Sequence, residues 1–165
     1  MRNLSVAAVL IACCTMFSGS TSALTVCNNI EYRQFDFWLG TWHARLPSGK
    51  TIGTNHIERE YEGCVIHERF TGDRNYGGES LNIYDAARKV WHQTWVDNTG
   101  TLLILEGSLH DGRMIMEGQT TGIHGVIRSR ITWTPNADGS VRQFWESADE
   151  KGQWKVAMDT LFTKN

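Results

Sequence analysis

Polar side chains that alternate with Trp or Tyr are the residues of this chain with the clearest chemical potential. Residues two apart on a β-strand point to the same face. Such shared faces carry Asn82 with Tyr84, Gln93 with Trp91 and Trp95, and Gln143 with Trp145. Ligand pockets combine aromatic walls with a few polar groups, whereas an interior that only fills space uses Leu, Ile and Val. The pattern predicts a half-polar cavity. The alternatives are a solid barrel whose polar groups form hydrogen bonds with one another, or a face that points outward.

Charged side chains on the same segments form a second candidate group. Arg128 and Arg130 share one face of a segment, and Glu68, Glu106 and Glu117 fall on successive or nearby segments. A buried Arg needs a carboxylate partner, and an inward Arg130 would hold the acidic head group of a ligand. We therefore add Glu68 and Arg130 to the expected ligand-binding residues. The alternative is solvated strand faces with cross-strand ion pairs.

Familiar catalytic and metal-binding motifs are missing from the sequence. The six histidines are scattered, and no pair has the His-x-His or His-Glu-x-x-His spacing of a metal site. There is no Gly-x-Ser-x-Gly elbow, phosphate-binding loop or dinucleotide fingerprint. We therefore assign no catalytic residue, no metal and no cofactor. If the protein is an enzyme, Glu68 or Glu146 would act as acid or base on a lipid or aromatic substrate in the same cavity.

Length and composition favour a single β-rich domain. The chain has 165 residues and a net charge of −2, without a basic block. That length suggests one domain, and nucleic-acid binding normally needs a basic stripe. Seven Trp and sixteen Gly with only two Pro favour strands and tight turns over helices.

The N-terminus has the layout of a secretory signal. One positive charge precedes an apolar run over residues 4–17, and small residues follow up to Ala23. The run is too short to span a membrane. We expect a signal peptide over 1–23 and an exported, periplasmic or secreted domain over 24–165. The alternative is lipoprotein processing, because residues before Cys13 resemble a lipobox.

Two cysteines remain in the expected mature chain. Thiols in an oxidising compartment are commonly paired, so Cys27 and Cys64 are expected to form a disulfide between the N-terminus and the second hairpin. The alternative is two separate thiols.

Alternating residues bounded by turn signals predict about ten strands and no long helix. The expected strands are 37–46, 51–62, 64–71, 79–85, 89–97, 101–109, 113–120, 123–134, 140–147 and 153–163. Short connections make neighbours antiparallel, and a meander this long closes to hide its edges. We therefore expect an all-β, up-and-down barrel with room for a small ligand. A short helical turn within 30–37 would cap one end, with Trp42 on its floor.

Five runs carry a resemblance to a known family. They are 35–42 (Phe-Asp-Phe-Trp-Leu-Gly-Thr-Trp), 63–64 (Gly-Cys), 78–85 (Gly-Glu-Ser-Leu-Asn-Ile-Tyr-Asp), 91–97 (Trp-His-Gln-Thr-Trp-Val-Asp) and 141–147 (Val-Arg-Gln-Phe-Trp-Glu-Ser). In this order they resemble a large bacterial family of exported, uncharacterised lipocalin-like domains of the calycin superfamily. The resemblance implies the fold and no particular activity. Nitrobindin-like barrels of that superfamily hold haem through a His near the last strand, and 153–163 contains no His.

Together these patterns predict an exported barrel that binds a small, hydrophobic or amphipathic molecule, without an assigned enzymatic activity. An enzyme acting in the same cavity and a structural envelope protein with a filled barrel are the alternatives. Neither a nucleic acid nor a membrane-spanning segment of the mature chain is expected.

Overall fold

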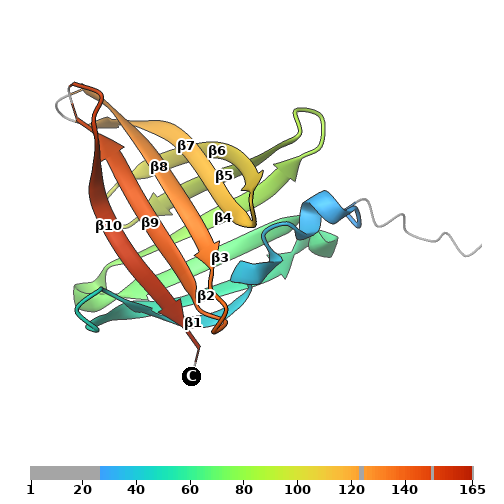
Figure 1. Cartoon of the computed structure of the whole chain (residues 1–165), viewed down its shortest axis with the longest axis horizontal. Coiled ribbons are helices and arrows are strands. Elements are labelled where there is room, and N and C mark those ends of the chain that lie inside the picture. Colours follow the sequence, from blue (N-terminus) through green and yellow to red (C-terminus); the bar gives the residue numbers. More distant parts are fainter. Residues whose placement is uncertain (1–26, 123–124, 150, 165) are drawn as a thin grey trace, which may run out of the picture.

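Ten strands form one closed antiparallel barrel in the order β1-β10-β9-β8-β7-β6-β5-β4-β3-β2 (Figure 1). The computed structural model describes residues 27–122, 125–149 and 151–164, so the expected signal peptide lies outside the described residues. Each strand pairs with its neighbours in sequence, and β1 also pairs with β10. Closure leaves no free sheet edge. The predicted fold class is confirmed.

The strand bounds follow the turn signals closely. The strands are β1 (Gly40–Arg45), β2 (Thr51–Glu60), β3 (Val65–Gly72), β4 (Gly77–Asp85), β5 (Val90–Asp97), β6 (Leu102–His110), β7 (Arg113–Gly122), β8 (Gly125–Pro135), β9 (Val141–Ala148) and β10 (Trp154–Thr163). The short 3-10 helices are η1 (Ile30–Arg33), η2 (Asp36–Trp38), η3 (Tyr61–Gly63) and η4 (Asp73–Asn75). The first strand begins at Gly40 rather than residue 37, because residues 36–38 form η2. Within the described residues, no helix has the length and apolarity needed to cross a membrane.

The helices η1 and η2 close one end of the barrel with aromatic side chains. Phe35 stacks on Trp38 with ring centroids 4.9 Å apart and meets Trp91 and Trp133 edge-on at 5.7 and 5.3 Å. Both Phe35 and Trp38 are fully buried. The Trp42 indole donates to the Trp38 carbonyl at 2.9 Å. This cluster fills the barrel interior at that end, as the aromatic run 35–42 predicts, and we call it the plug.

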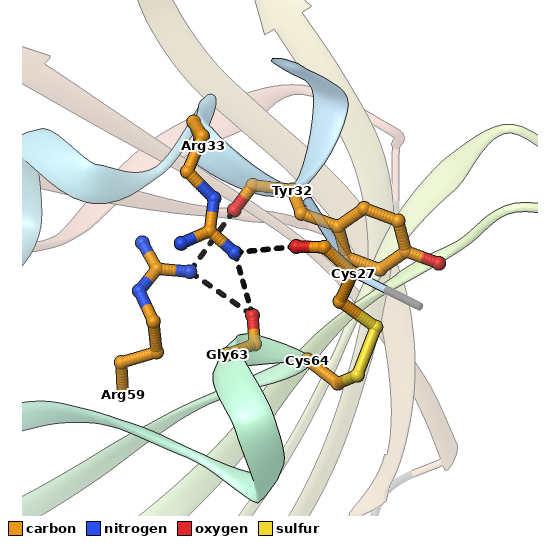
Figure 2. The surroundings of a disulfide bond; sticks show 6 residues. All are labelled: Cys27, Tyr32, Arg33, Arg59, Gly63 and Cys64. Atoms are coloured by element: carbon orange, nitrogen blue, oxygen red, sulfur yellow. Dashed lines mark hydrogen bonds between the residues drawn. A yellow bond between two sulfur atoms is a disulfide. The ribbon is translucent and has the colours of Figure 1, made fainter. Parts of the chain in front are cut away.

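A disulfide and two arginines join the segment that precedes the plug, residues 27–33, to the β2–β3 connection (Figure 2). Cys27 and Cys64 are bonded, which confirms the predicted pairing. Arg33 Nη2 donates to the carbonyls of Cys27 and Gly63 at 2.7 and 2.8 Å. Arg59 Nη1 donates to the carbonyls of Tyr32 and Gly63 at 3.3 and 3.1 Å. The two guanidinium groups thus donate to backbone carbonyls that lie outside the strands and have no partner in the sheet.

Candidate functional site

A cavity of about 550 Å³ occupies the half of the barrel away from the plug. Residues of the β1–β2, β3–β4 and β5–β6 connections line its mouth, including Lys50, Asp73, Arg74 and Thr99. The β1–β2 and β3–β4 connections are joined there by an ion pair between Lys50 Nζ and Asp73 Oδ2 at 3.5 Å. The cavity therefore opens at the end of the barrel that η1 and η2 leave uncovered.

Apolar side chains make the walls of the cavity. The aromatic members are Phe70, Tyr76, Trp95, Trp145 and Phe162, and the aliphatic members are Ile52, Leu103, Ile131 and Met158. A Cβ atom at Gly78 would lie 2.4 Å from Trp95 Cζ2, so the glycine on β4 makes room for the indole. Trp95 is also fixed by a hydrogen bond from its Nε1 to Asp97 Oδ2 at 3.2 Å. The indole face is thereby held in place beside the cavity.

Five polar side chains on β2 to β5 form a buried network at the base of the cavity. The carboxyl of Glu68 accepts hydrogen bonds from Asn55 Nδ2 at 2.7 Å and from Ser80 Oγ at 2.6 Å. Ser80 Oγ in turn accepts from Asn82 Nδ2 at 2.9 Å and from Gln93 Nε2 at 3.4 Å. Gln93 Nε2 also donates to Asn82 Oδ1 at 2.9 Å. The hydrogen bonds therefore form a chain that ends at the Glu68 carboxyl: Gln93 donates to Asn82, Asn82 to Ser80, and Ser80 to Glu68.

Glu68 is a carboxyl group with an unusual pKa. The side chain is 4 % exposed. Burial raises its pKa to about 7, against the opposing effects of the Ser80 and Asn55 hydrogen bonds and of the nearby His67. Near neutral pH the group is therefore divided between its neutral and charged forms. A carboxyl with this property, in contact with a cavity, is a candidate functional group.

The opposite side of the cavity carries further polar groups. Gln143 on β9 pairs across the strands with Thr160 on β10, and both line the cavity. Trp145 Nε1 and Thr160 Oγ1 are buried and have no hydrogen-bond partner among the described residues. Hydrogen-bonding capacity is thus left over in side chains that surround the cavity.

The structure brings most, but not all, of the expected ligand-binding residues together. Glu68, Gln93, Trp95, Gln143 and Trp145 all line the cavity. Asn82 points inward but lies behind this lining, where its amide donates to Ser80 and to the Ile66 carbonyl.

Tyr84 and Trp91 belong to the plug rather than to the cavity. Tyr84 packs edge-on against Tyr32 at 5.4 Å, and the Trp91 indole donates to Gln34 Oε1 at 3.1 Å. Both residues face inward, as expected. Two-residue periodicity fixes the face of a side chain but not its depth along the barrel axis, which explains the difference.

Arg130 does not point into the barrel, so this expectation is wrong. Its neighbours Ser129 and Ile131 are buried inside, and alternation places Arg130 on the outer surface. There it donates to Glu146 Oε2 at 2.9 and 3.0 Å and lies over the Trp154 ring at 4.5 Å. The Glu146 carboxylate is thus engaged on the outer surface, and the acid or base role considered for it in the cavity does not fit.

Asn55, Ser80 and Phe70 are the main site residues that were missing from the expected set. A buried Asn two residues before Ile57 on a strand is the signal that could have found Asn55, because a polar residue on a core-facing register needs a partner. Ser80 shares its face with Asn82 and Tyr84, and Phe70 shares its face with Glu68. The sequence shows which residues share a face of a strand. It does not show which of them come into contact with residues of other strands.

Comparisons with known proteins add no assignment to this geometry. A scan against protein-family models and a search of curated proteins both return no match. In the part of the chain that the structure describes, no group of three or more His, Cys, Asp or Glu side chains is arranged to hold a metal ion. Fold and site together define a ten-stranded up-and-down barrel that is plugged at one end and hollow at the other.

Proposed function

We propose that this protein is an exported barrel that binds a small, partly apolar molecule in its cavity. The observation that carries the proposal is the cavity itself. Its volume of about 550 Å³ lies within the range of about 300–1,000 Å³ that is usual for small-molecule sites. Aromatic walls around a few fixed polar groups are also the usual composition of such sites.

Export and family membership belong to the same proposal. The Cys27–Cys64 disulfide suits an oxidising compartment, and the N-terminal 23 residues have the layout of a secretory signal. The closed barrel is the fold that the resemblance to exported lipocalin-like domains implies. That resemblance supports the proposal through the five sequence runs that carry it.

The alternative function, a structural protein with a filled barrel, accounts less well for the hollow end of the barrel. The plug fills one end with tightly packed rings, but the other end keeps a cavity surrounded by Trp95, Trp145 and Phe70. Large aromatic side chains around an unfilled space favour the binding of a ligand, because apolar atoms that border a void lack the dispersion contacts that a packed neighbour would provide.

Acid–base chemistry at Glu68 is a second candidate function. The raised pKa of this carboxyl, about 7, suits proton transfer near neutral pH. The candidate requires turnover of a lipid or aromatic substrate that is lost in the Glu68→Gln variant. Binding without turnover leaves the first proposal in place and removes the second.

Native mass spectrometry of protein purified from its own host tests the binding proposal. We expect a co-purifying small molecule that is released when the protein unfolds. A panel of lipids and aromatic acids and amines, followed by thermal denaturation, tests the purified protein further. Absence of a bound molecule together with no shift of Tm across the whole panel would contradict the proposal.

A further inference from the structure

The charges around the cavity are distributed unequally between its base and its mouth. Among the described ionisable residues that line the cavity, Glu68 is the one that lies at its buried base. The cations of that lining, Lys50 and Arg74, belong to the connections at the mouth, where Lys50 pairs with Asp73. The remaining carboxylate of the lining, Asp97, lies at the end of β5 next to the mouth, and it already accepts hydrogen bonds from Tyr76, Trp95, Thr99 and Thr101. Arg130, the cation expected inside, lies on the outer surface with Glu146. The base of the cavity therefore presents a carboxyl group and no opposing cation of the described chain.

The hydrogen bonds at Glu68 make this carboxyl an acceptor toward its protein neighbours. Asn55 and Ser80 each donate to a different carboxyl oxygen. The Ser80 hydroxyl oxygen already accepts from Asn82 and Gln93, so it has little capacity to receive a proton from Glu68. This arrangement matches the ionised form, which has about four acceptor positions, two of them still open. The ionised form in a buried site needs a cation to balance it.

We propose that the ligand is an amphipathic cation, an amine carried on an apolar body, whose ammonium group binds at Glu68. This inference rests on the proposed binding function and narrows it to one class of ligand. The ammonium would form a charge-assisted hydrogen bond with the open acceptor positions of Glu68. Gln93 offers a second acceptor, because its Nε2 is used by Asn82 while the structure gives its Oε1 no hydrogen bond to a described residue.

The strand register places an apolar wall beside this head-group site. Glu68 pairs across the sheet with Ser80, and Ser80 pairs with Trp95, so the three lie in one row. Adjacent strands are about 4.8 Å apart, which puts the Trp95 backbone roughly 10 Å from that of Glu68. An ammonium at Glu68 would therefore leave the attached chain alongside Trp95, with Trp145 also in the lining.

A carboxylate ligand does not suit the same site. Its head group would meet the Glu68 charge without a cation at the base, and like charges in a buried site repel strongly. A neutral alcohol would fill the apolar walls but would gain only an ordinary hydrogen bond. The three head groups on one apolar chain therefore predict an order of affinity: amine, then alcohol, then carboxylate.

Dodecylamine, dodecanol and dodecanoate test this order, with affinities measured by quenching of tryptophan fluorescence. The protein is expressed as the full chain in a host that exports it and forms disulfides. We expect the amine to bind about tenfold tighter than the alcohol, which corresponds to one charged hydrogen bond. The Glu68→Gln variant should bind both about equally, with its alcohol affinity close to that of the parent. Glu117→Gln removes an equivalent charge from the outer surface and should keep the preference.

Each result separates the inference from the function on which it rests. Equal affinity for amine and alcohol, tightest binding of dodecanoate, or a preference that survives in Glu68→Gln would overturn the amine inference while leaving a binding barrel. Failure of all three ligands to bind would also overturn the amine inference, and the cavity function itself falls only if, in addition, no molecule co-purifies and no compound of the wider panel shifts the Tm. If Glu68→Gln does not fold, the amine inference is tested on the parent protein instead, by measuring the preference for the amine at different pH values. Its amine preference must then fall as the pH drops through about 7, where Glu68 becomes protonated, and a constant preference would contradict the inference.

Discussion

The two ends of this barrel use the same residue types for different purposes. In the plugged end, Trp38, Trp91 and Trp133 pack around Phe35 and have almost no exposed surface. In the hollow end, Trp95 and Trp145 stand beside a cavity of about 550 Å³. All five indoles point into the barrel. An inward-facing Trp therefore does not identify a ligand site; unfilled space beside it does.

Polar groups differ between the two ends in the same way. In the plug, charged and amide side chains serve backbone or indole partners, as Arg33 does for two carbonyls and Gln34 does for Trp91. At the cavity base, the network ends at a carboxyl group that has open acceptor positions. The plug leaves Trp38 Nε1 and Trp133 Nε1 buried without a hydrogen-bond partner among the described residues, but these atoms lie among packed rings. The network at the cavity base instead borders open space and can accept one more partner. This comparison predicts that changes in the plug alter stability and changes at the cavity alter binding.

The largest expected effect is the loss of stability in the Trp38→Ala variant. Trp38 is fully buried, and its Nε1 has no hydrogen-bond partner in the described residues, so truncation removes packing rather than a polar contact. We expect the free energy of unfolding to fall by about 4 kcal/mol, the usual effect of deleting a buried aromatic ring. Urea denaturation followed by circular dichroism measures the change. A loss close to zero would mean that the plug is not part of the cooperative core.

Breaking the Cys27–Cys64 disulfide should have a comparable effect on the same end. The bond joins residues that are 37 positions apart, and closing such a loop in the unfolded chain is worth about 4 kcal/mol in the chain-entropy model. The Cys27→Ser, Cys64→Ser double variant is the test, because it leaves no unpaired thiol of this pair. Its urea midpoint should fall. Its relative affinities for the three dodecyl ligands should stay unchanged, since the disulfide lies at the plugged end.

Glu68 gives the hollow end a pH dependence of opposite sign to that of the surface carboxylates. Its pKa is raised from 4.5 to about 7 on folding, so between these values the folded state binds a proton that the unfolded state has lost. The stability contributed by this group is fully present below pH 4.5 and is lost as the pH rises through about 7. The loss amounts to about 3 kcal/mol at one pKa unit per 1.36 kcal/mol. Carboxylates such as Glu60 and Asp85, whose pKa values are lowered by Arg69 and Arg88, act instead at lower pH and favour folding as the pH rises.

Urea denaturation of the parent and the Glu68→Gln variant across this pH window measures the effect. The difference in unfolding free energy between the two proteins should change with pH, because histidines and other groups contribute equally to both. Glu117→Gln, which removes an exposed carboxylate from the outer surface, is the matched control for the loss of a negative charge. A flat difference for Glu68→Gln would mean that Glu68 keeps an ordinary pKa in the folded protein.

The barrel was predictable from the sequence because each strand carries its own signals. Alternation with Gly, Asp and Pro turns located all ten strands, and the position of Cys27 and Cys64 predicted their pairing. The membership of the site was harder. Trp91 and Trp95 lie on the same face of β5, yet only Trp95 reaches the cavity. The space next to Trp91 is occupied by Gln34 and Phe35, which connect η1 to η2. A pattern within one strand cannot report what another segment fills.

Arg130 illustrates a second reason for the difference. A cation near several carboxylates suggests a buried ion pair, but the inward register of β8 was set by Ser129 and Ile131. A shift of one residue moves a side chain from the inside of a barrel to the outside. The partner of Arg130 is Glu146 on β9, and it became evident only from the register between the two strands.

The smallest expected change in stability belongs to Trp95→Ala, and it sharpens the comparison most. Trp95 borders existing space and is only partly buried, so its removal enlarges a cavity rather than creating one. We expect a loss of about 1 kcal/mol in the free energy of unfolding, largely from the hydrogen bond to Asp97. Affinity for dodecanol should fall about tenfold, because the ligand loses an aromatic wall.

Trp38→Ala is the matched control for this variant, since it removes the same side chain from the other end. The two substitutions should separate: Trp38→Ala lowers stability and, while the protein stays folded, leaves dodecanol affinity nearly unchanged, and Trp95→Ala does the reverse. Urea denaturation and fluorescence titration on both variants measure the two quantities side by side. If Trp95→Ala instead lost as much stability as Trp38→Ala, the hollow end would be part of the packed core and its aromatic walls would need no ligand to explain them.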